Sequence, residues 1–182
     1  MFSASDGSWA NDGGAAALAE LLDRQQIETL IHQYCRSVDR IDEELGHSIF
    51  HADATANYGD FYRGSGFGAI DAICESHRHL VSHSHQITTT TIAIDGDRAG
   101  SEAYHIAAIR MMATGKLMQV TVWGRYLDTW SRRGGQWGID HRQVLRDLDE
   151  IREVMPLSPG VPLRGRDCPS YTVLRVSLPS KN

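Results

Sequence analysis

With 182 residues, 41% of them hydrophobic and 23% charged, the chain has the size and composition of one globular domain with a core of its own. A net charge of −5 without a dense basic run argues against nucleic acid as a partner, and no apolar run reaches the length of a membrane span. Three widely spaced cysteines do not suggest a disulfide framework, and the N-terminus lacks a signal-peptide pattern, so we expect a cytoplasmic protein.

The first part of the chain is predicted to be mostly helical. Residues 1–14 are rich in Gly, Ser, Asp and Asn, and we expect them to be disordered. From residue 15 to 38, apolar side chains recur every three or four positions, which predicts an amphipathic helix. The pattern then predicts a turn and a short helix over 39–50, a strand with a glycine turn over 51–64, and a third helix over 67–82.

The following part is predicted to be β-sheet. Four segments rich in β-branched and aromatic residues are separated by short glycine-containing turns, which is typical of an antiparallel meander. These segments are 86–94, 101–112, 117–132 and 137–145. Strands longer than ten residues must twist and coil, so we expect the sheet to curl around the N-terminal helices. We expect the proline-rich extension 149–182 to cover the protein's own surface or a neighbouring subunit.

Four polar residues are candidates for chemistry, and each has a simpler structural explanation, which for a strand histidine is a hydrogen bond to the backbone. His83 and His85 are two residues apart at the start of a predicted strand, where their side chains would share one face. Asp39 ends the first predicted helix, where a solvent-exposed aspartate is common. Strand alternation places Arg142 on the face opposite Ile139, and a lone strand arginine is usually a surface charge.

Other chemistries lack a complete pattern. An H-x-H pair can contribute to a zinc or iron site if a third ligand joins it, and His105 and Glu102 are the candidates. However, no metal-binding motif accompanies the pair, so we predict no metal site. The chain also has no G-x-S-x-G motif and no glycine-rich nucleotide-binding loop, so we predict no cofactor. Histidine, aspartate, tyrosine and arginine remain, and these residue types serve general acid–base catalysis.

Three stretches of the chain resemble the SnoaL-like family of the nuclear-transport-factor-two-like superfamily. They are IETLIHQYCRSVDR, HSHQITTTTIAIDGDRA and GRYLDTWSRRGGQWGIDHRQV, and the resemblance covers about residues 25–148. It implies an α+β fold in which a strongly curved antiparallel sheet forms a cone around the N-terminal helices and encloses a pocket. The SnoaL-like domain would then span residues 15–148.

The resemblance to hexachlorocyclohexane dehydrochlorinases, bile acid 7α-dehydratases and scytalone dehydratases of this superfamily also implies site residues. Asp39 would support His85 as the catalytic base, Arg142 would hold Asp39 ionised or neutralise developing charge, and His83 would be structural or at the pocket rim. Tyr34 lies where the dehydrochlorinases have a lysine, and a phenol is better suited to an oxygen leaving group than to a halide. Substrate-binding side chains would be Phe61, Tyr104, His105, Met111, Met118 and Trp123.

These features predict a cofactor-independent lyase with a His85–Asp39 dyad as base. The enzyme would eliminate water, or another small group such as formaldehyde or hydrogen halide, from a hydrophobic aromatic or polycyclic substrate in a mainly apolar pocket. The alternative is a non-catalytic ligand-binding protein or a structural subunit, like the β subunits of ring-hydroxylating dioxygenases. The resemblance also implies a homo-oligomer, a dimer or trimer, and Val120 and Trp130 are candidates for apolar side chains on the outside of the sheet.

Overall fold

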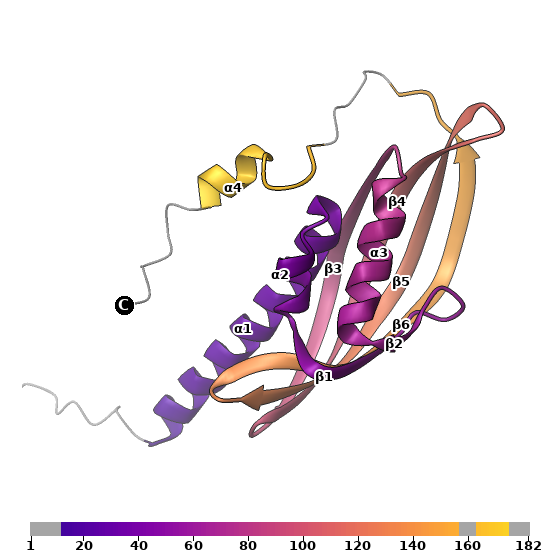
Figure 1. The fold of residues 1–182 in the computed structure, drawn as a ribbon. Coiled ribbons are helices and arrows are strands. Elements are labelled where there is room, and N and C mark those ends of the chain that lie inside the picture. The colour runs from indigo at the N-terminus through magenta and orange to yellow at the C-terminus, as the bar shows by residue number, and fades with distance from the viewer. Residues whose placement is uncertain (1–11, 157–162, 175–182) are drawn as a thin grey trace, which may run out of the picture.

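The computed structural model describes residues 12–156 and 163–174, which form helices packed against one curved sheet (Figure 1). The helices are α1 (Asp12–Arg40), α2 (Glu43–His47), α3 (Gly66–Arg78) and α4 (Pro169–Leu174). The strands are β1 (Phe50–Asn57), β2 (Arg63–Ser65), β3 (Ser82–Asp95), β4 (Arg98–Ala113), β5 (Lys116–Arg133) and β6 (Gln136–Glu153). In the sheet these strands lie in the order β2-β1-β6-β5-β4-β3. None of the helices within the described ranges is long and apolar enough to cross a membrane.

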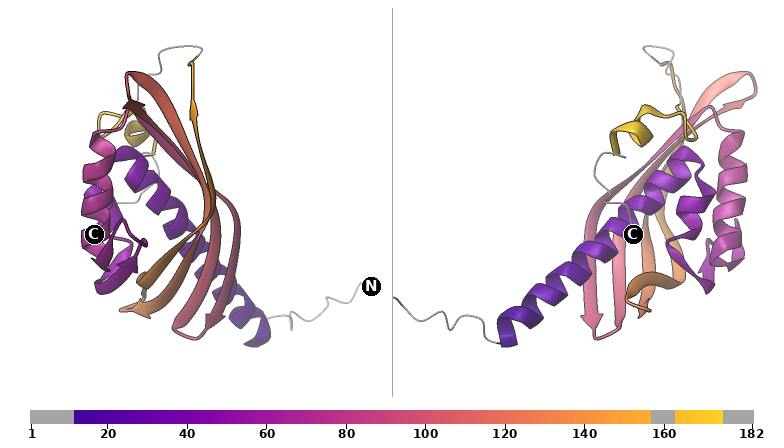
Figure 2. Two further views of the ribbon diagram at one scale, coloured as in Figure 1. Left: turned by 90° about the vertical axis from the view of Figure 1, so that its right-hand side faces the viewer. Right: turned by 60° about the vertical axis from the view of Figure 1, so that its left-hand side comes forward.

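The predicted meander is confirmed, since β3, β4, β5 and β6 pair with one another in antiparallel order. The prediction of a wholly antiparallel sheet is wrong, because β1 runs parallel to β6. The sequence of β1 carries no sign of its neighbour's direction, which depends on how the helices lead the chain back to the sheet. The longest strands have 18 residues, and they bend around the helices as expected for long twisted strands (Figure 2).

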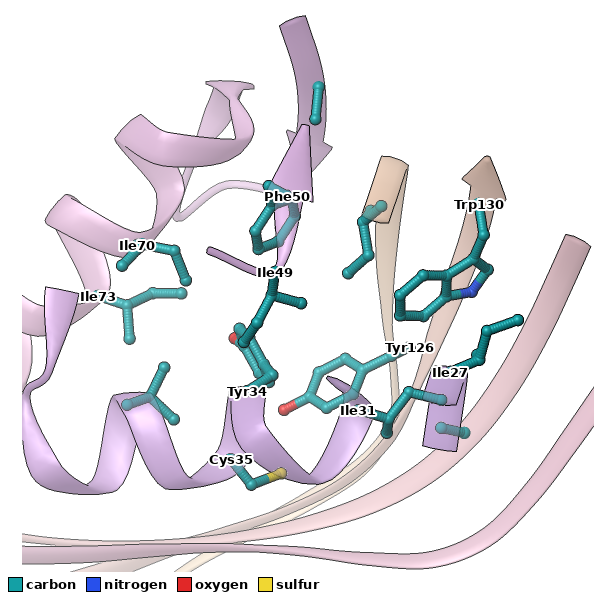
Figure 3. Close-up of a cluster of buried hydrophobic side chains, with 14 of the residues drawn as sticks. Ile27, Ile31, Tyr34, Cys35, Ile49, Phe50, Ile70, Ile73, Tyr126 and Trp130 are labelled. Carbon is teal, nitrogen blue, oxygen red and sulfur yellow. The ribbon is translucent and has the colours of Figure 1, made fainter. Parts of the chain in front are cut away.

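The core lies between the concave face of the sheet and helices α1 and α3, which are both on this side (Figure 2). Helix α1 contributes Ile27, Ile31, Tyr34 and Val38, all at most 2% exposed and spaced by three or four residues as predicted. Figure 3 shows Ile31 and Tyr34 facing Tyr126 of β5. The predicted apolar stripe continues toward the N-terminus but is not buried there. Its exposed members are Leu18, Leu21 and Leu22.

The limits of the ordered elements differ from those predicted. Helix α1 begins at Asp12, so residues 12–14 are helical, while residues 1–11 of the expected disordered segment lie outside the described residues. Strand β6 continues to Glu153, beyond the expected domain end at residue 148. Segment 163–174 of the expected extension packs against α1 and α2 of its own chain, whereas residues 157–162 and 175–182 are not described.

A β-bulge changes which face of β6 points inward. Ile139 pairs with Trp130, but the next pair joins Thr129 to His141, so Asp140 is an extra residue on β6. This insertion shifts the alternation by one, and Arg142 lies in the core on the same side as Ile139. The predicted placement of Arg142 on the opposite face is therefore wrong.

Two apolar side chains expected on the outside of the sheet lie on its concave side. Trp130 is 1% exposed, and its indole N–H donates a hydrogen bond to Ser101 over 2.9 Å. Val120 is paired with Ile109, which lines the cavity described below, and directly paired residues point to the same face. Both positions have the same parity along β5 as the buried Tyr126, which the sequence pattern alone did not assign to a face.

Candidate active site

A cavity of about 570 Å³ lies between the concave sheet and the helices. This volume falls within the usual range for small-molecule sites. Its wall is mainly apolar and aromatic, with three histidines. The main contributors are Tyr34 of α1, Tyr58 and Phe61 of the β1–β2 loop, Ile73 and His77 of α3, His85 of β3, His105 and Ile109 of β4, Val122 and Tyr126 of β5, and Val144 of β6.

His85 and Asp39 form the predicted hydrogen-bonded pair at the edge of this cavity. The Nδ1 of His85 donates to Oδ1 of Asp39 over 2.8 Å, and the backbone N–H of His85 donates to both carboxylate oxygens over 3.1 and 3.0 Å. Because a carboxylate only accepts hydrogen bonds, the proton of neutral His85 lies on Nδ1. Nε2 is then the free basic nitrogen of a side chain that lines the cavity.

The end of α1 determines where Asp39 lies. Ile41 has a φ of 55°, a left-handed conformation that is rare for a β-branched residue and that ends the helix. The N–H of Ile41 donates to the carbonyl of Val38, and the N–H of Asp42 donates to the carbonyl of Ser37, which is the Schellman pattern of a helix C-terminus. Asp39 therefore sits in the last turn of α1, directly before the chain reverses.

His83 does not line the cavity and is ruled out by position as the base. Its Nε2 donates to the carbonyl of Val38 over 3.1 Å, and its ring packs on His77 with 4.3 Å between centroids. His77 also stacks near His85, at 5.4 Å, and was not recognised in the sequence. Burial and the neighbouring histidines lower the pKa of His77 to about 3, so this ring is neutral near pH 7.

Two tyrosine hydroxyls meet inside the cavity. Those of Tyr34 and Tyr58 are 2.9 Å apart, and burial raises the pKa of both phenols, so both remain protonated. Tyr58 was not recognised in the sequence, because it belongs to the loop after β1. The side-chain Oδ1 of Asn57 accepts a hydrogen bond from the N–H of Gly59, which has a φ of 65°. This turn presents Tyr58 to the cavity.

Arg142 is fully buried but does not contact Asp39, so the prediction that it holds Asp39 ionised is wrong, while its role in neutralising developing charge stays a prediction. Its guanidinium forms a two-pronged ion pair with Asp128, with both N···O distances 2.7 Å and neither side chain exposed. Its Cζ lies 4.0 Å from the ring centroid of Tyr34 and 4.4 Å from that of Tyr126. Arg142 therefore stands behind the tyrosines that line the cavity, and is not part of its wall.

His105 lies deeper in the cavity wall, on β4. Its ring stacks on Tyr126 with 4.0 Å between centroids and 5° between planes. Burial lowers the pKa of His105 to about 4, so it is neutral near pH 7, and its Nδ1 is buried with no hydrogen-bond partner among the described residues. Its partner on β5 is Gly124, where a Cβ would lie 2.8 Å from Cε1 of His105. The absence of a side chain at Gly124 makes room for this ring.

Of the six predicted substrate-binding residues, Phe61 and His105 line the cavity. Tyr104 and Trp123 alternate with inward-facing residues and therefore lie on the convex face, where Tyr104 is 43% exposed beside Arg125. Met111 and Met118 pair with each other next to the β4–β5 turn and do not line the cavity. The substrate-binding residues were predicted from their aromatic or Met side chains. Which of them line the cavity is decided by the alternation of faces and by the position along the strand.

The residues that the structure describes include no group of three or more His, Cys, Asp or Glu side chains arranged to hold a metal ion. Glu102, one candidate ligand, pairs instead with Arg125 at 3.1 Å. The second candidate, His105, is stacked on Tyr126 as described above.

Comparison with known proteins agrees with the fold. The SnoaL-like domain matches residues 19–143, and no curated protein matches the sequence significantly. A hexachlorocyclohexane dehydrochlorinase, LinA type 3 from Novosphingobium barchaimii, superposes with a TM-score of 0.67 at 17% identity, over 80% of this chain and 99% of that one. A proposed scytalone dehydratase from Novosphingobium aromaticivorans gives 0.63 at 19% identity, over 76% and 95%. A variant of a Mycobacterium tuberculosis protein of unknown function gives 0.60 at 22% identity, over 72% and 75%.

Proposed function

This chain belongs to the SnoaL-like family, and we propose that it is a cofactor-independent lyase that eliminates a small group from a hydrophobic substrate. The observation that carries the proposal is the hydrogen bond between His85 and Asp39 at the edge of a mainly apolar cavity. A histidine that is oriented by a carboxylate and presents its other nitrogen to a ligand site is the usual arrangement of a general base.

In the proposed reaction, Nε2 of His85 removes a proton from an activated carbon of the substrate. The electrons of that C–H bond form the new double bond, and the leaving group departs with its bonding electrons from the adjacent carbon. Asp39 stabilises the imidazolium that forms, as the hydrogen bond to Nδ1 strengthens when the ring becomes charged. The protonated His85 then returns its proton to the solvent or to the leaving group.

The two tyrosines favour an oxygen leaving group. Only one O–H is used in the hydrogen bond between Tyr34 and Tyr58, so the other O–H can donate to a ligand. A phenol donor stabilises negative charge on a departing hydroxide or on a carbonyl oxygen more effectively than on a halide. We therefore propose dehydration of a hydroxylated aromatic or polycyclic compound as the reaction, with loss of formaldehyde or hydrogen halide as alternatives.

The test is to incubate the purified protein with matched substrates that differ only in the leaving group. We expect turnover of hydroxylated compounds in the wild type, and a loss in Tyr34→Phe that is larger for hydroxide than for chloride as leaving group. Loss of chloride alone, unaffected by Tyr34→Phe, would contradict dehydration but keep the lyase. Tight binding of these compounds without turnover would support the non-catalytic alternative, a ligand-binding protein or a structural subunit of the same fold.

A further inference from the structure

A part of the chain outside the SnoaL-like match contacts the backbone next to the dyad. Segment 163–168 precedes α4 and runs past the C-terminal end of α1 (Figure 2). The N–H of Gly165 donates to the carbonyl of Arg40 over 2.7 Å. That carbonyl is at the end of α1, where helix geometry provides no partner. The segment therefore caps α1 one residue after Asp39.

Arg164 connects three further elements through its guanidinium. Nη1 donates to the carbonyl of His77 over 3.1 Å, and Nη2 donates to the carbonyl of Leu80 over 2.9 Å. Nη2 also lies 3.4 Å from Nδ1 of His83. The two carbonyls lie at the end of α3 and in the turn to β3, so one side chain fixes the approach of the chain to the strand that carries His85.

Through His83, Arg164 is also connected to the backbone carbonyl that precedes Asp39. An arginine only donates hydrogen bonds, so Nδ1 of His83 accepts and the ring proton of neutral His83 lies on Nε2. This is the nitrogen that donates to the carbonyl of Val38 over 3.1 Å. Val38 and Arg40 flank Asp39 in the chain. The segment therefore holds the carbonyl before Asp39 through Arg164 and His83, and the carbonyl after it through Gly165.

We infer that Arg164 and Gly165 are a working part of the active site and that Arg164 is a positioning residue for the Asp39–His85 pair. Arg164 does not line the cavity, so it acts on the chemistry only through the side chain of His83 and the backbone of the elements that carry the dyad. A lysine cannot replace it, because a single ammonium on a flexible stem does not present the planar fork that reaches two carbonyls and an imidazole together. The kinetic part of this inference rests on the proposed function, whereas the structural part does not.

The test compares Arg164→Ala and Arg164→Lys with Arg166→Ala. Arg166 belongs to the same segment, but it pairs with Glu44 at the surface and has only a longer contact of 3.8 Å with Asp42, so its loss is the matched control. The first readout needs no substrate. It is the NMR signal of the Nδ1 proton of His85, which reports the hydrogen bond to Asp39. We expect this signal to shift or broaden in both Arg164 variants and to keep its wild-type position in Arg166→Ala.

The second readout is steady-state kinetics on a compound that the protein converts among the matched substrates of the proposed function. A base displaced by a fraction of an ångström should lower kcat by about 10- to 100-fold and leave KM within a few-fold. If Arg164→Ala does not fold, as judged by circular dichroism, Arg164→Lys decides the question with the same readouts. A folded Arg164 variant with the wild-type His85 signal would overturn the inference. A shifted signal in a protein without turnover would support it while rejecting the proposed function.

Discussion

At the level of single residues, the proposed chemistry depends on His85 and Asp39. Replacement of His85 by Ala should lower kcat by about 10²- to 10⁴-fold, the usual contribution of a general base, and leave substrate affinity within a few-fold. Asp39→Asn keeps the size of the side chain but removes the charge that stabilises the imidazolium, so it should also act on kcat. Steady-state kinetics check both. Wild-type turnover in His85→Ala would show that the base is another residue, and His77 or His105, which line the cavity, would be next.

A second residue-level prediction concerns the buried pair of Arg142 and Asp128. Arg142→Met would leave the Asp128 carboxylate without its partner in the core, and such losses cost about 3–5 kcal/mol of unfolding free energy. Urea unfolding monitored by tryptophan fluorescence measures the change. The control is Lys116→Met, which removes an exposed ion pair with Glu153 and should shift the midpoint little. Equal midpoints for both variants would mean that the buried pair does not contribute.

At the level of elements, how much the sequence could predict depends on the range of the interaction concerned. The helix through Ile31 and Tyr34 and the meander of β3–β6 follow from periodicity, which is local. The parallel pairing of β1 with β6 does not, since it depends on two segments about 90 residues apart. The bulge at Asp140 could not be predicted from the sequence pattern either. It shifts the alternation, so Arg142 lies in the core and not on the predicted surface.

The candidate site divides in the same way. His85 and Asp39 could be named because each stands out in its own motif, at a strand start and a helix end. Tyr58 and His77 could not, because a loop tyrosine and a histidine near the end of a helix resemble ordinary surface residues until the fold brings them to one cavity. The role of Arg164 could not be predicted from a sequence pattern either, since its partners are mostly backbone carbonyls.

The close contact between β5 and β6 at Gly124 allows a prediction about how tightly these two strands pack. A Cβ at Gly124 would lie 2.3 Å from the carbonyl oxygen of Leu145 and would crowd His105, so Gly124→Ala must push β6 or the ring aside. Overpacking of this kind costs about 1–3 kcal/mol, and thermal unfolding should show it. Gly100→Ala is the control on the neighbouring strand β4, where the new Cβ meets nothing within 4 Å. Equal stability of the two variants would contradict the tight contact.

At the level of the whole molecule, two buried neutral histidines make the unfolding free energy depend on pH. Burial lowers the folded-state pKa of His77 to about 3 and of His105 to about 4, below the ordinary value of 6.5. Between those values and 6.5 the unfolded chain binds more protons. These two groups should therefore reduce stability as pH falls from about 6.5 to 4, with a slope of up to about 2.7 kcal/mol per pH unit.

Urea titrations between pH 4 and 7.5 measure this slope. His105→Gln removes one of the two titrating rings. The slope of the unfolding free energy against pH should therefore fall by the contribution of one proton, about half of the total. A slope that is unchanged in the variant would mean that His105 is charged in the folded protein or already accessible to solvent.

Exposed apolar side chains predict self-association. Leu18, Leu21 and Leu22 are each more than half exposed on α1, as are Leu148 and Ile151 at the far end of β6. Large exposed apolar side chains that are grouped on one element favour contact with another molecule. We expect a dimer or trimer, with a mass from light scattering of about two or three times 20.2 kDa. A mass near 20.2 kDa at micromolar concentration would contradict it, and charged residues at the three α1 positions should shift the equilibrium toward monomer.

The way in which Asp39 and His85 are held has a consequence for how such a protein can evolve. The two residues are fastened to main-chain groups, through the N–H of His85 and the carbonyls on either side of Asp39. Side chains such as Phe61, Ile73 and Val144 line the cavity but take no part in this fastening. Selection or laboratory evolution can therefore change the side chains of the cavity wall to admit a new compound while the proposed base keeps its geometry. One scaffold can in this way come to accept many substrates and keep the proposed reaction.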